Sequence, residues 1–311
     1  DPPGDASVRI VNHTGHKLIS GFPEGRRMWL NVRFLDSQGN TISEINPYQP
    51  LLVSTNAQGN KVYVAGGDLT VTRDDLVYEA NMSSSLTGES KTFHFVLATD
   101  RYKDNRIPPR GFRIADAPAR IAHPRWHGED AMDYFTPEEY AGGYDEVNFT
   151  KPANAAGWVA TLFYQTTSKP YIDFLRDEIK GTAGSLLGVP APSGELPVYR
   201  VQSDPFFSTL KGWGDAIWDL WLHNGGSAPV AMTTTISAPV ITAMEMSAGT
   251  PVVSIQTLPL RLYQLERSTE LTPGSWTAVG TEFVGDGTAK PLTDPTPPSG
   301  HAFYRVRNRL P

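Results

Sequence analysis

Two histidines near the start of the chain, His13 and His16, are the residues whose type and spacing point most directly to chemistry. They stand three residues apart in the segment Asn-His-Thr-Gly-His, just after a short strand-like run. A neutral imidazole can bind copper or haem iron, and a tight turn can bring two imidazoles to one ion. Neither histidine has a Cys or a carboxylate beside it in the sequence, so hydrogen-bonded loop histidines are the alternative interpretation.

Further candidate ligands lie near residue 100. His94 stands between two phenylalanines, where strand alternation would point its imidazole away from the face that the two rings share. It is a third candidate metal ligand, with a hydrogen-bonded or surface imidazole as the alternative. Asp100, Asp104 and Asn105 offer the hard oxygen ligands that Ca²⁺ prefers, although without the spacing of an EF-hand.

Recognisable catalytic motifs are missing from the sequence. There is no Gly-x-Ser-x-Gly, no His-Glu-x-x-His and no Gly-rich phosphate loop after a strand. The carboxylate pairs Asp74-Asp75 and Glu138-Glu139 are adjacent residues, whereas a glycosidase needs two carboxylates that face each other across the scissile bond. The sequence therefore favours a protein without a catalytic site, while a copper or haem redox protein built on His13 and His16 stays open.

The composition limits the cofactors and partners. The 311 residues include no Cys, which excludes disulfides, thiolate metal sites and covalently bound c-type haem on this chain. The formal charge is −6 and no basic tract occurs, so we expect no nucleic-acid partner. The long uncharged stretch 220–244 is interrupted by Gly and Pro, so we expect no membrane anchor.

Strand-like alternation dominates the first two thirds of the chain. Segment 27–35 shows it most clearly, and a turn follows at 36–40. The side chains expected on one face of that strand are Met28, Leu30, Val32 and Phe34. Further strands are expected at 8–11, 61–64, 91–97 and 158–166. The 28 Gly and 26 Pro favour many turns, as a mainly β chain requires.

Three helices are expected among these strands. Thr136-Pro-Glu-Glu139 is a capping box that opens a short helix, and a second helix begins near Pro170 and ends at Gly181. A third begins at Asp204, and we interpret its apolar stripe as the face that packs on a sheet. That stripe consists of Phe206, Phe207, Leu210, Trp213, Ile217, Leu220 and Trp221.

A Gly- and Pro-rich hinge at 225–229 divides the chain into predicted domains 1–225 and 230–311. After the hinge, short strands are expected at 239–246, 250–256, 262–267 and 302–307, with the turn spacing of an immunoglobulin-like or fibronectin type III sandwich. The predicted fold is mainly β: a β-sandwich domain with a few packed helices, followed by a smaller immunoglobulin-like β-sandwich. We expect the second domain to fold alone.

Several segments together resemble one family. Residues 8–18 and 21–30 resemble the start of the β-rich region that follows the haem-binding part of secreted bacterial multihaem c-type cytochromes. The segments that resemble later landmarks of that region, in the same order, are 92–95, 103–112, 133–135, 140–144, 164–168, 171–175 and 204–207. The chain departs from the family at Ile19-Ser20, where relatives read Pro-Thr. The final part, with 263–268, Trp276 and 303–306, resembles C-terminal sandwich modules of other secreted bacterial proteins.

The resemblance implies a non-catalytic module, secreted, periplasmic or at the cell surface, that supports electron transfer or assembly of a multihaem cytochrome. Because the chain has no Cys-x-x-Cys-His motif, the haem would belong to a preceding part of the same gene product or to a separate chain. His13, His16, Arg26 and Arg27 are the candidate contacts to that haem, the arginines through its propionates. A structural or adhesive surface or filament protein is the alternative. The chain begins at Asp1, and we expect a processed chain or a fragment.

Overall fold

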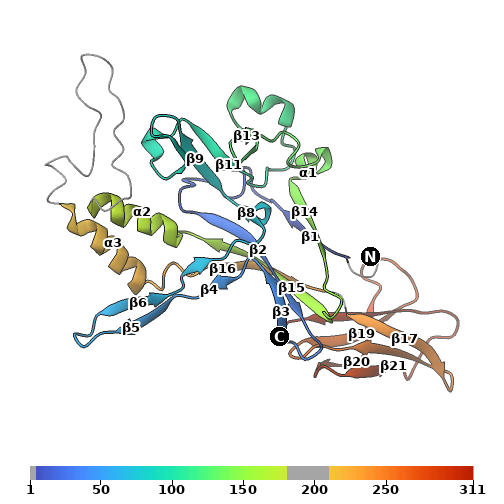
Figure 1. Ribbon diagram of the computed structural model, residues 1–311. Coiled ribbons are helices and arrows are strands. Elements are labelled where there is room, and N and C mark those ends of the chain that lie inside the picture. Colours follow the sequence, from blue (N-terminus) through green and yellow to red (C-terminus); the bar gives the residue numbers. More distant parts are fainter. Residues whose placement is uncertain (1–4, 181–209, 238, 311) are drawn as a thin grey trace, which may run out of the picture.

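The computed structural model describes residues 5–180, 210–237 and 239–310, and its centre is a sheet with the strand order β16-β15-β2-β3 (Figure 1). A short strand, β8, also pairs with β2. These strands are β2 (Arg27–Leu35), β3 (Thr41–Ile45), β8 (Val77–Tyr78), β15 (Gly157–Gln165) and β16 (Val230–Ile236). β2 pairs with β15 along its whole length, and every β2 residue except Arg33 is buried.

Two strands that are far apart in the sequence cover one face of this sheet. They are β1 (Asp5–Val11) and β14 (Tyr144–Thr150), which pair antiparallel. The core on this side contains the four alternating side chains of β2 that the sequence predicted, so that prediction is confirmed. The opposite face of β2 is buried too, because Trp29 stacks on Tyr48 and Phe163.

A second sheet has the order β10-β9-β11-β12-β13. Its strands are β9 (Ala80–Ser84), β10 (Glu89–Thr92), β11 (Asp100–Asp104), β12 (Arg125–Trp126) and β13 (Glu129–Asp130). The predicted strand at 91–97 is wrong after its second residue. The Thr92 hydroxyl accepts a hydrogen bond from the backbone N–H of His94 at 3.0 Å, which turns the chain into the 3₁₀ turn η2 (Phe95–Leu97).

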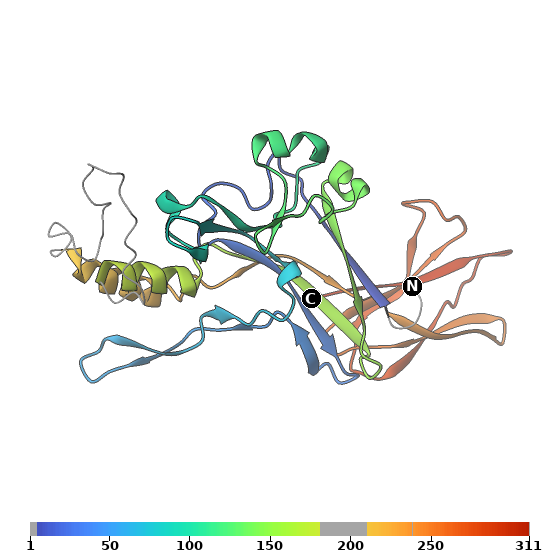
Figure 2. The ribbon, with the colours of Figure 1, turned by 45° about the horizontal axis from the view of Figure 1, so that its top comes forward.

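Short elements connect the sheets. β4 (Tyr48–Gln49) pairs with β7 (Asp68–Leu69), and β5 (Leu52–Thr55) forms a hairpin with β6 (Lys61–Ala65). Three further 3₁₀ turns are η1 (Asp74–Leu76), η3 (Ile114–Asp116) and η4 (Pro118–Arg120). Figures 1 and 2 show the β5–β6 hairpin extending from the central sheet beneath the helices at one end of the molecule.

Two of the predicted helices are confirmed closely. α1 (Pro137–Gly142) begins after Thr136, whose hydroxyl accepts the Glu139 N–H while the Glu139 carboxylate accepts the Thr136 N–H. α2 (Lys169–Lys180) lies within one residue of the predicted bounds. The capping chemistry and the apolar spacing were therefore sufficient to locate both helices.

α3 (Gly212–His223) corrects the interpretation of the aromatic stripe. Its predicted start at Asp204 lies outside the described residues. Trp213 is 61% exposed, so it does not pack on a sheet as expected. Instead α3 packs on α2 through Gly214, where a Cβ atom would lie 2.6 Å from the carbonyl oxygen of Arg176. Among the described members of the stripe, Trp221 is the buried one, in a cluster with Ile172 of α2.

The C-terminal part consists of two three-stranded sheets, β17-β18-β21 and β20-β19-β22. The strands are β17 (Val240–Ser247), β18 (Thr250–Gln256), β19 (Leu262–Ser268), β20 (Thr277–Val284), β21 (Ala289–Thr293) and β22 (Phe303–Arg309). The mainly β fold class is confirmed. β16 pairs with β15, so residues 230–236 extend the central sheet, and the division into domains 1–225 and 230–311 stays a prediction.

Candidate functional site

The loop between β1 and β2 carries the two histidines, and the side chain of Asn12 holds its backbone in place. The Asn12 amide nitrogen donates to the carbonyl oxygens of His16 at 2.8 Å and Ile107 at 2.9 Å. Its oxygen accepts the backbone N–H and the hydroxyl of Thr14, both at 2.8 Å. Because Asn12 is buried, these bonds fix the turn that presents His13 and His16.

A second chain segment, 103–112, is joined to this loop. Leu18 and Ile107 exchange backbone hydrogen bonds of 2.9 and 3.1 Å. Gly143 lies against the same segment at a φ of +68°, and a Cβ there would lie 2.4 Å from the backbone nitrogen of Arg110. The carbonyl of Gly143 accepts the N–H of Asn12 at 2.8 Å. Three segments that are far apart in the sequence thus meet at one place.

The imidazoles of His13 and His16 are both exposed. Within the described part of the chain, neither ring makes a hydrogen bond or an ion pair. No group of three or more His, Asp or Glu side chains suited to a metal ion occurs among the described residues. The two rings are therefore presented to the outside, and their role in binding a metal or a partner's haem stays a prediction.

The two arginines that follow the loop have different surroundings. Arg27 is buried, where its guanidinium donates to the side chains of Gln165 and Asp68, both at 2.9 Å. Arg26 is half-buried beside the loop, since a Cβ on Gly21 would lie 3.3 Å from its Nη1. The structure therefore places Arg26 with the histidine loop and Arg27 in a separate polar network.

Three cationic side chains form ion pairs with Asp104 next to the loop. Lys17 Nζ lies 3.0 Å from its Oδ2, Arg101 Nη1 lies 2.8 Å from the same oxygen, and Arg106 forms a bidentate pair at 2.8 and 3.0 Å. Burial opposes ionisation of Asp104, but the hydrogen bonds and charge of Arg106, together with Lys17, hold the pKa of this carboxyl well below its ordinary value. Burial also lowers the pKa of the Lys17 amine, to about 8.

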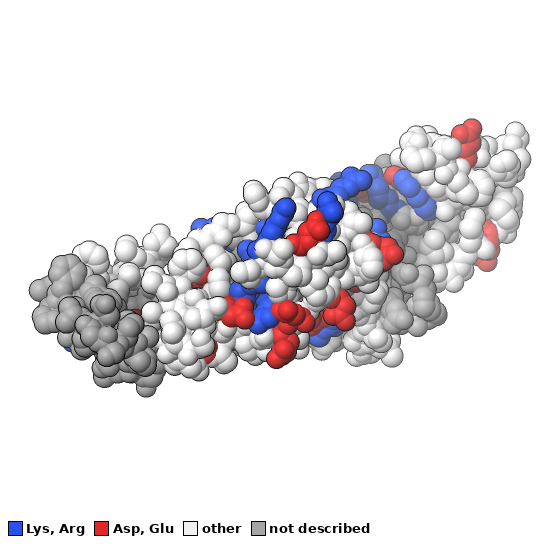
Figure 3. Space-filling model, turned by 90° about the horizontal axis from the view of Figure 1, so that it is seen from above, with Lys and Arg blue, Asp and Glu red and all other residues white. Residues whose placement is uncertain are grey.

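The three residues considered for Ca²⁺ are engaged by other groups. Asp104 faces the cations just described, and Asp100 forms an ion pair with Arg125 at 2.6 Å. The Asn105 side chain donates to the carbonyl of Asp75 and to the hydroxyl of Tyr134. On the face seen from above in Figure 3, Lys and Arg side chains lie beside Asp and Glu side chains, as such pairing requires.

An open pocket of about 410 Å³ lies between the loop and segment 103–112. Its lining consists of His16, Lys17, Ser20, Gly21 and Arg106. Sequence reasoning singled out His16 but missed Lys17 and Arg106. The signal that was present is their position inside the two resembling segments 8–18 and 103–112. Which cationic side chains pair with Asp104 depends on the tertiary fold, and no sequence pattern predicts it.

His94 lies outside this pocket and is held by acidic partners. Its Nδ1 lies 3.1 Å from the Glu89 carboxylate, and its Nε2 lies 3.4 Å from the carboxylate of Glu178 on α2. The ring also meets Phe174 edge-on at 5.0 Å. The hydrogen bond with Glu178 is the main cause that raises the pKa of His94, with Glu89 adding to it. In this structure His94 connects β10 to α2.

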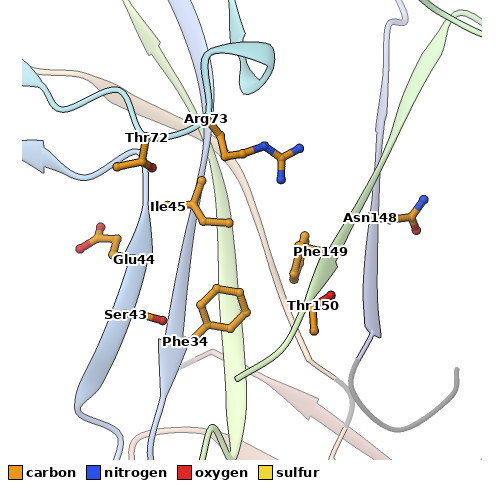
Figure 4. Close-up of a pocket in the computed structure, with 9 residues that line it drawn as sticks. All are labelled: Phe34, Ser43, Glu44, Ile45, Thr72, Arg73, Asn148, Phe149 and Thr150. Atoms are coloured by element: carbon orange, nitrogen blue, oxygen red, sulfur yellow. The ribbon is translucent and has the colours of Figure 1, made fainter. Parts of the chain in front are cut away.

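Two other pockets offer less chemistry. One, of about 590 Å³, opens between β3 and β14, with Phe34, Ile45 and Phe149 pointing into it (Figure 4). Its charged residues are engaged, Arg73 with a neighbouring aspartate and Glu44 with an asparagine amide. A second, of about 450 Å³, lies near β10 and α2 and has both acidic and basic lining residues. Neither brings together an uncompensated set of like charges.

Comparisons with known proteins give one distant structural similarity. No family model matches the chain, and no curated protein has a matching sequence. Among solved structures, the chain is similar to a penta-haem cytochrome c552 from Thermochromatium tepidum, with 12% identity and a TM-score of 0.37 over 76% of this chain. The similarity covers 36% of that cytochrome chain, so it concerns about a third of its length. At this identity and TM-score it carries no inference about function. In the described residues, no helix is both long and apolar enough to cross a membrane.

Proposed function

We propose that the chain is a non-catalytic, extracytoplasmic module that docks on a multihaem c-type cytochrome through the face around the β1–β2 loop. The observation that carries the proposal is the convergence of resembling segments at that face. Residues 8–18 and 103–112 are joined by the Leu18–Ile107 bridge, and Gly143 of segment 140–144 bonds to Asn12. Segment 140–144 is also tied to 103–112 by the stacking of Tyr140 on Phe112 at 5.8 Å.

The exposed imidazoles give this face a chemical role. An imidazole without a hydrogen-bond partner is free to bind the iron of a nearby haem or to donate to one of its substituents. Arg26, beside the same loop, is placed to pair with a haem propionate through charge-assisted hydrogen bonds. In this proposal the module supports electron transfer or assembly and leaves the redox chemistry to its partner.

The test is the affinity for a multihaem c-type cytochrome from the same bacterium, measured with a His13→Glu/His16→Glu variant. Both positions are exposed, so the fold tolerates the change, while two negative charges oppose docking next to haem propionates. The expected result is an affinity at least about tenfold lower. His301→Glu, an exposed histidine of the C-terminal part, is the matched control and should bind as wild type. Equal affinities for all three proteins would refute the docking face.

A structural or adhesive surface protein is the second candidate, and β17 favours it. β17 lies at the edge of its sheet, and all eight of its residues are exposed. Its exposed apolar side chains are Val240, Ile241, Met244 and Met246. An unprotected apolar edge strand can pair with a strand of another chain. Concentration-dependent assembly in light scattering, abolished by Ile241→Lys, would favour this candidate over the first.

A further inference from the structure

The group around Asp104 has more positive than negative charge. Lys17, Arg101 and Arg106 share this single carboxylate, which is 1% exposed. Glu24 also interacts electrostatically with Arg106, and its buried carboxylate accepts no hydrogen bond from another described residue. Burial raises the pKa of Glu24, and even with both carboxylates ionised the three cations outnumber the two acidic groups.

The two cationic side chains that line the pocket, Lys17 and Arg106, have unused hydrogen-bond donors. Lys17 has three N–H donors and uses one of them on Asp104. Arg106 has five N–H donors. Its Nε and its Nη2 each donate one hydrogen bond to Asp104, and its Nη1 donates one to the carbonyl of Ile19 at 3.3 Å, so two donors remain unused. Both side chains line the same pocket, so the unused donors of the two residues lie around one open space.

The other residues that line the pocket add further polar groups. Ser20 contributes a hydroxyl, and His16 an imidazole without a partner in the described part of the chain. Gly21 has a φ of +80°, and its missing Cβ lets the Arg26 guanidinium lie against the loop. The ring of Phe112, 5.9 Å from Lys17 Nζ, forms an apolar neighbour that excludes water from one side of the amine. Such a site strengthens charge-assisted hydrogen bonds.

From this arrangement we infer that the pocket between the β1–β2 loop and segment 103–112 binds an oxyanion, a phosphate or carboxylate group, through Lys17 and Arg106. The guanidinium edge and the amine suit two oxygens of one planar or tetrahedral anion. The pocket of about 410 Å³ admits such a group and is open, so the anion can be free or part of a larger molecule. The carboxylate could belong to a haem propionate of the proposed cytochrome partner. Only this form of the inference rests on the proposed function.

Calorimetric titration with inorganic phosphate and with propionate, at constant ionic strength, tests the inference on the full chain. Wild type should bind at least one of the two saturably. Ser20→Asp places a negative charge at an exposed position on the rim, outside the Asp104 network, and should weaken binding at least tenfold. Lys17→Gln should weaken it similarly. Lys290→Gln, which removes a lysine paired with Asp286 in the C-terminal part, is the matched control and should leave binding unchanged.

The pH dependence gives a second readout. Lys17 loses its proton as the pH rises through about 8, while Asp104, whose pKa lies well below its ordinary value, stays ionised. Affinity for the anion should therefore fall over that interval. It should fall in the same way in His16→Gln, which removes the imidazole of the pocket lining. The fall should disappear in Lys17→Gln.

The outcomes separate the sources of the anion. Binding of phosphate alone indicates a free phosphate or a phosphorylated ligand, and binding of propionate alone indicates a carboxylate carried by a partner. No saturable binding of either anion, or equal binding by wild type and Ser20→Asp, overturns the inference. Neither of these results bears on docking of a cytochrome, which the His13→Glu/His16→Glu variant tests separately.

Discussion

At the scale of single residues, the buried Asn12 fixes the turn that presents the exposed imidazoles of His13 and His16. His13 and His16 were recognised by type and spacing alone. Asn12, which fixes their turn with four hydrogen bonds, was missed because two of its partners are carbonyls, one of them 95 residues away. Every residue has a backbone carbonyl, so the sequence does not show which carbonyls accept hydrogen bonds from a buried side chain such as that of Asn12.

His94 gives a pH-dependent prediction at this scale. Its pKa is raised in the folded chain, mainly by Glu178 and then by Glu89, so its contribution is present in full below the unfolded value of about 6.5 and is lost as the pH rises through the folded pKa. Chemical denaturation of His94→Gln should show a deficit against wild type of about 1 kcal/mol at acidic pH and a smaller one at alkaline pH. A deficit that is the same at both ends contradicts the ion-pair account of His94.

At the scale of elements, the sequence predicted those helices and strands whose signals lie within the element itself. β2 has the predicted bounds and α2 lies within one residue of them, because apolar alternation and helix-start signals act within a few residues. The strand expected at 91–97 failed because one hydroxyl, that of Thr92, turned the backbone. The pairing of β16 with β15 could not be read from the sequence, because the two strands are more than sixty residues apart.

Two of the three tryptophans of α3, Trp213 and Trp221, test how this helix packs. Trp221 is 4% exposed between α2 and the β5–β6 hairpin, whereas Trp213 points outward. Trp221→Ala should lower the free energy of unfolding by about 3–5 kcal/mol, as truncation of a buried aromatic does. Trp213→Ala should lower it by less than about 0.5 kcal/mol. Urea denaturation measures both, and similar losses for the two variants would show that the helix packs by another face.

At the scale of the whole molecule, the C-terminal sheets form a unit attached to the end of the central sheet. They have their own core around Tyr263 and Ile255. Contacts to the rest include Leu258, which packs on Leu35 and Val159, and Arg261, which donates to the carbonyl of Trp158. These contacts involve few side chains compared with the internal core of the unit.

We therefore expect residues 237–311, without β16, to fold alone. Expressed separately, this segment should melt cooperatively, because its two sheets bury their shared core without help from the central sheet. Replacing Leu258, a buried contact residue that separation from the central sheet would expose, with a polar residue should improve the solubility of the segment without changing the transition. A broad, non-cooperative melt monitored by circular dichroism would show that the central sheet is needed.

The haem absorption spectrum and midpoint potential of the cytochrome, recorded with and without the bound module, test the proposed function most directly. Wild-type module should shift at least one haem signal if, as proposed, an exposed imidazole of the β1–β2 loop contacts the haem. His16→Ala or His13→Ala should remove the shift while His301→Ala retains it. Docking without any change in spectrum or potential, identical for wild type and all three variants, would contradict a contact between these histidines and a haem.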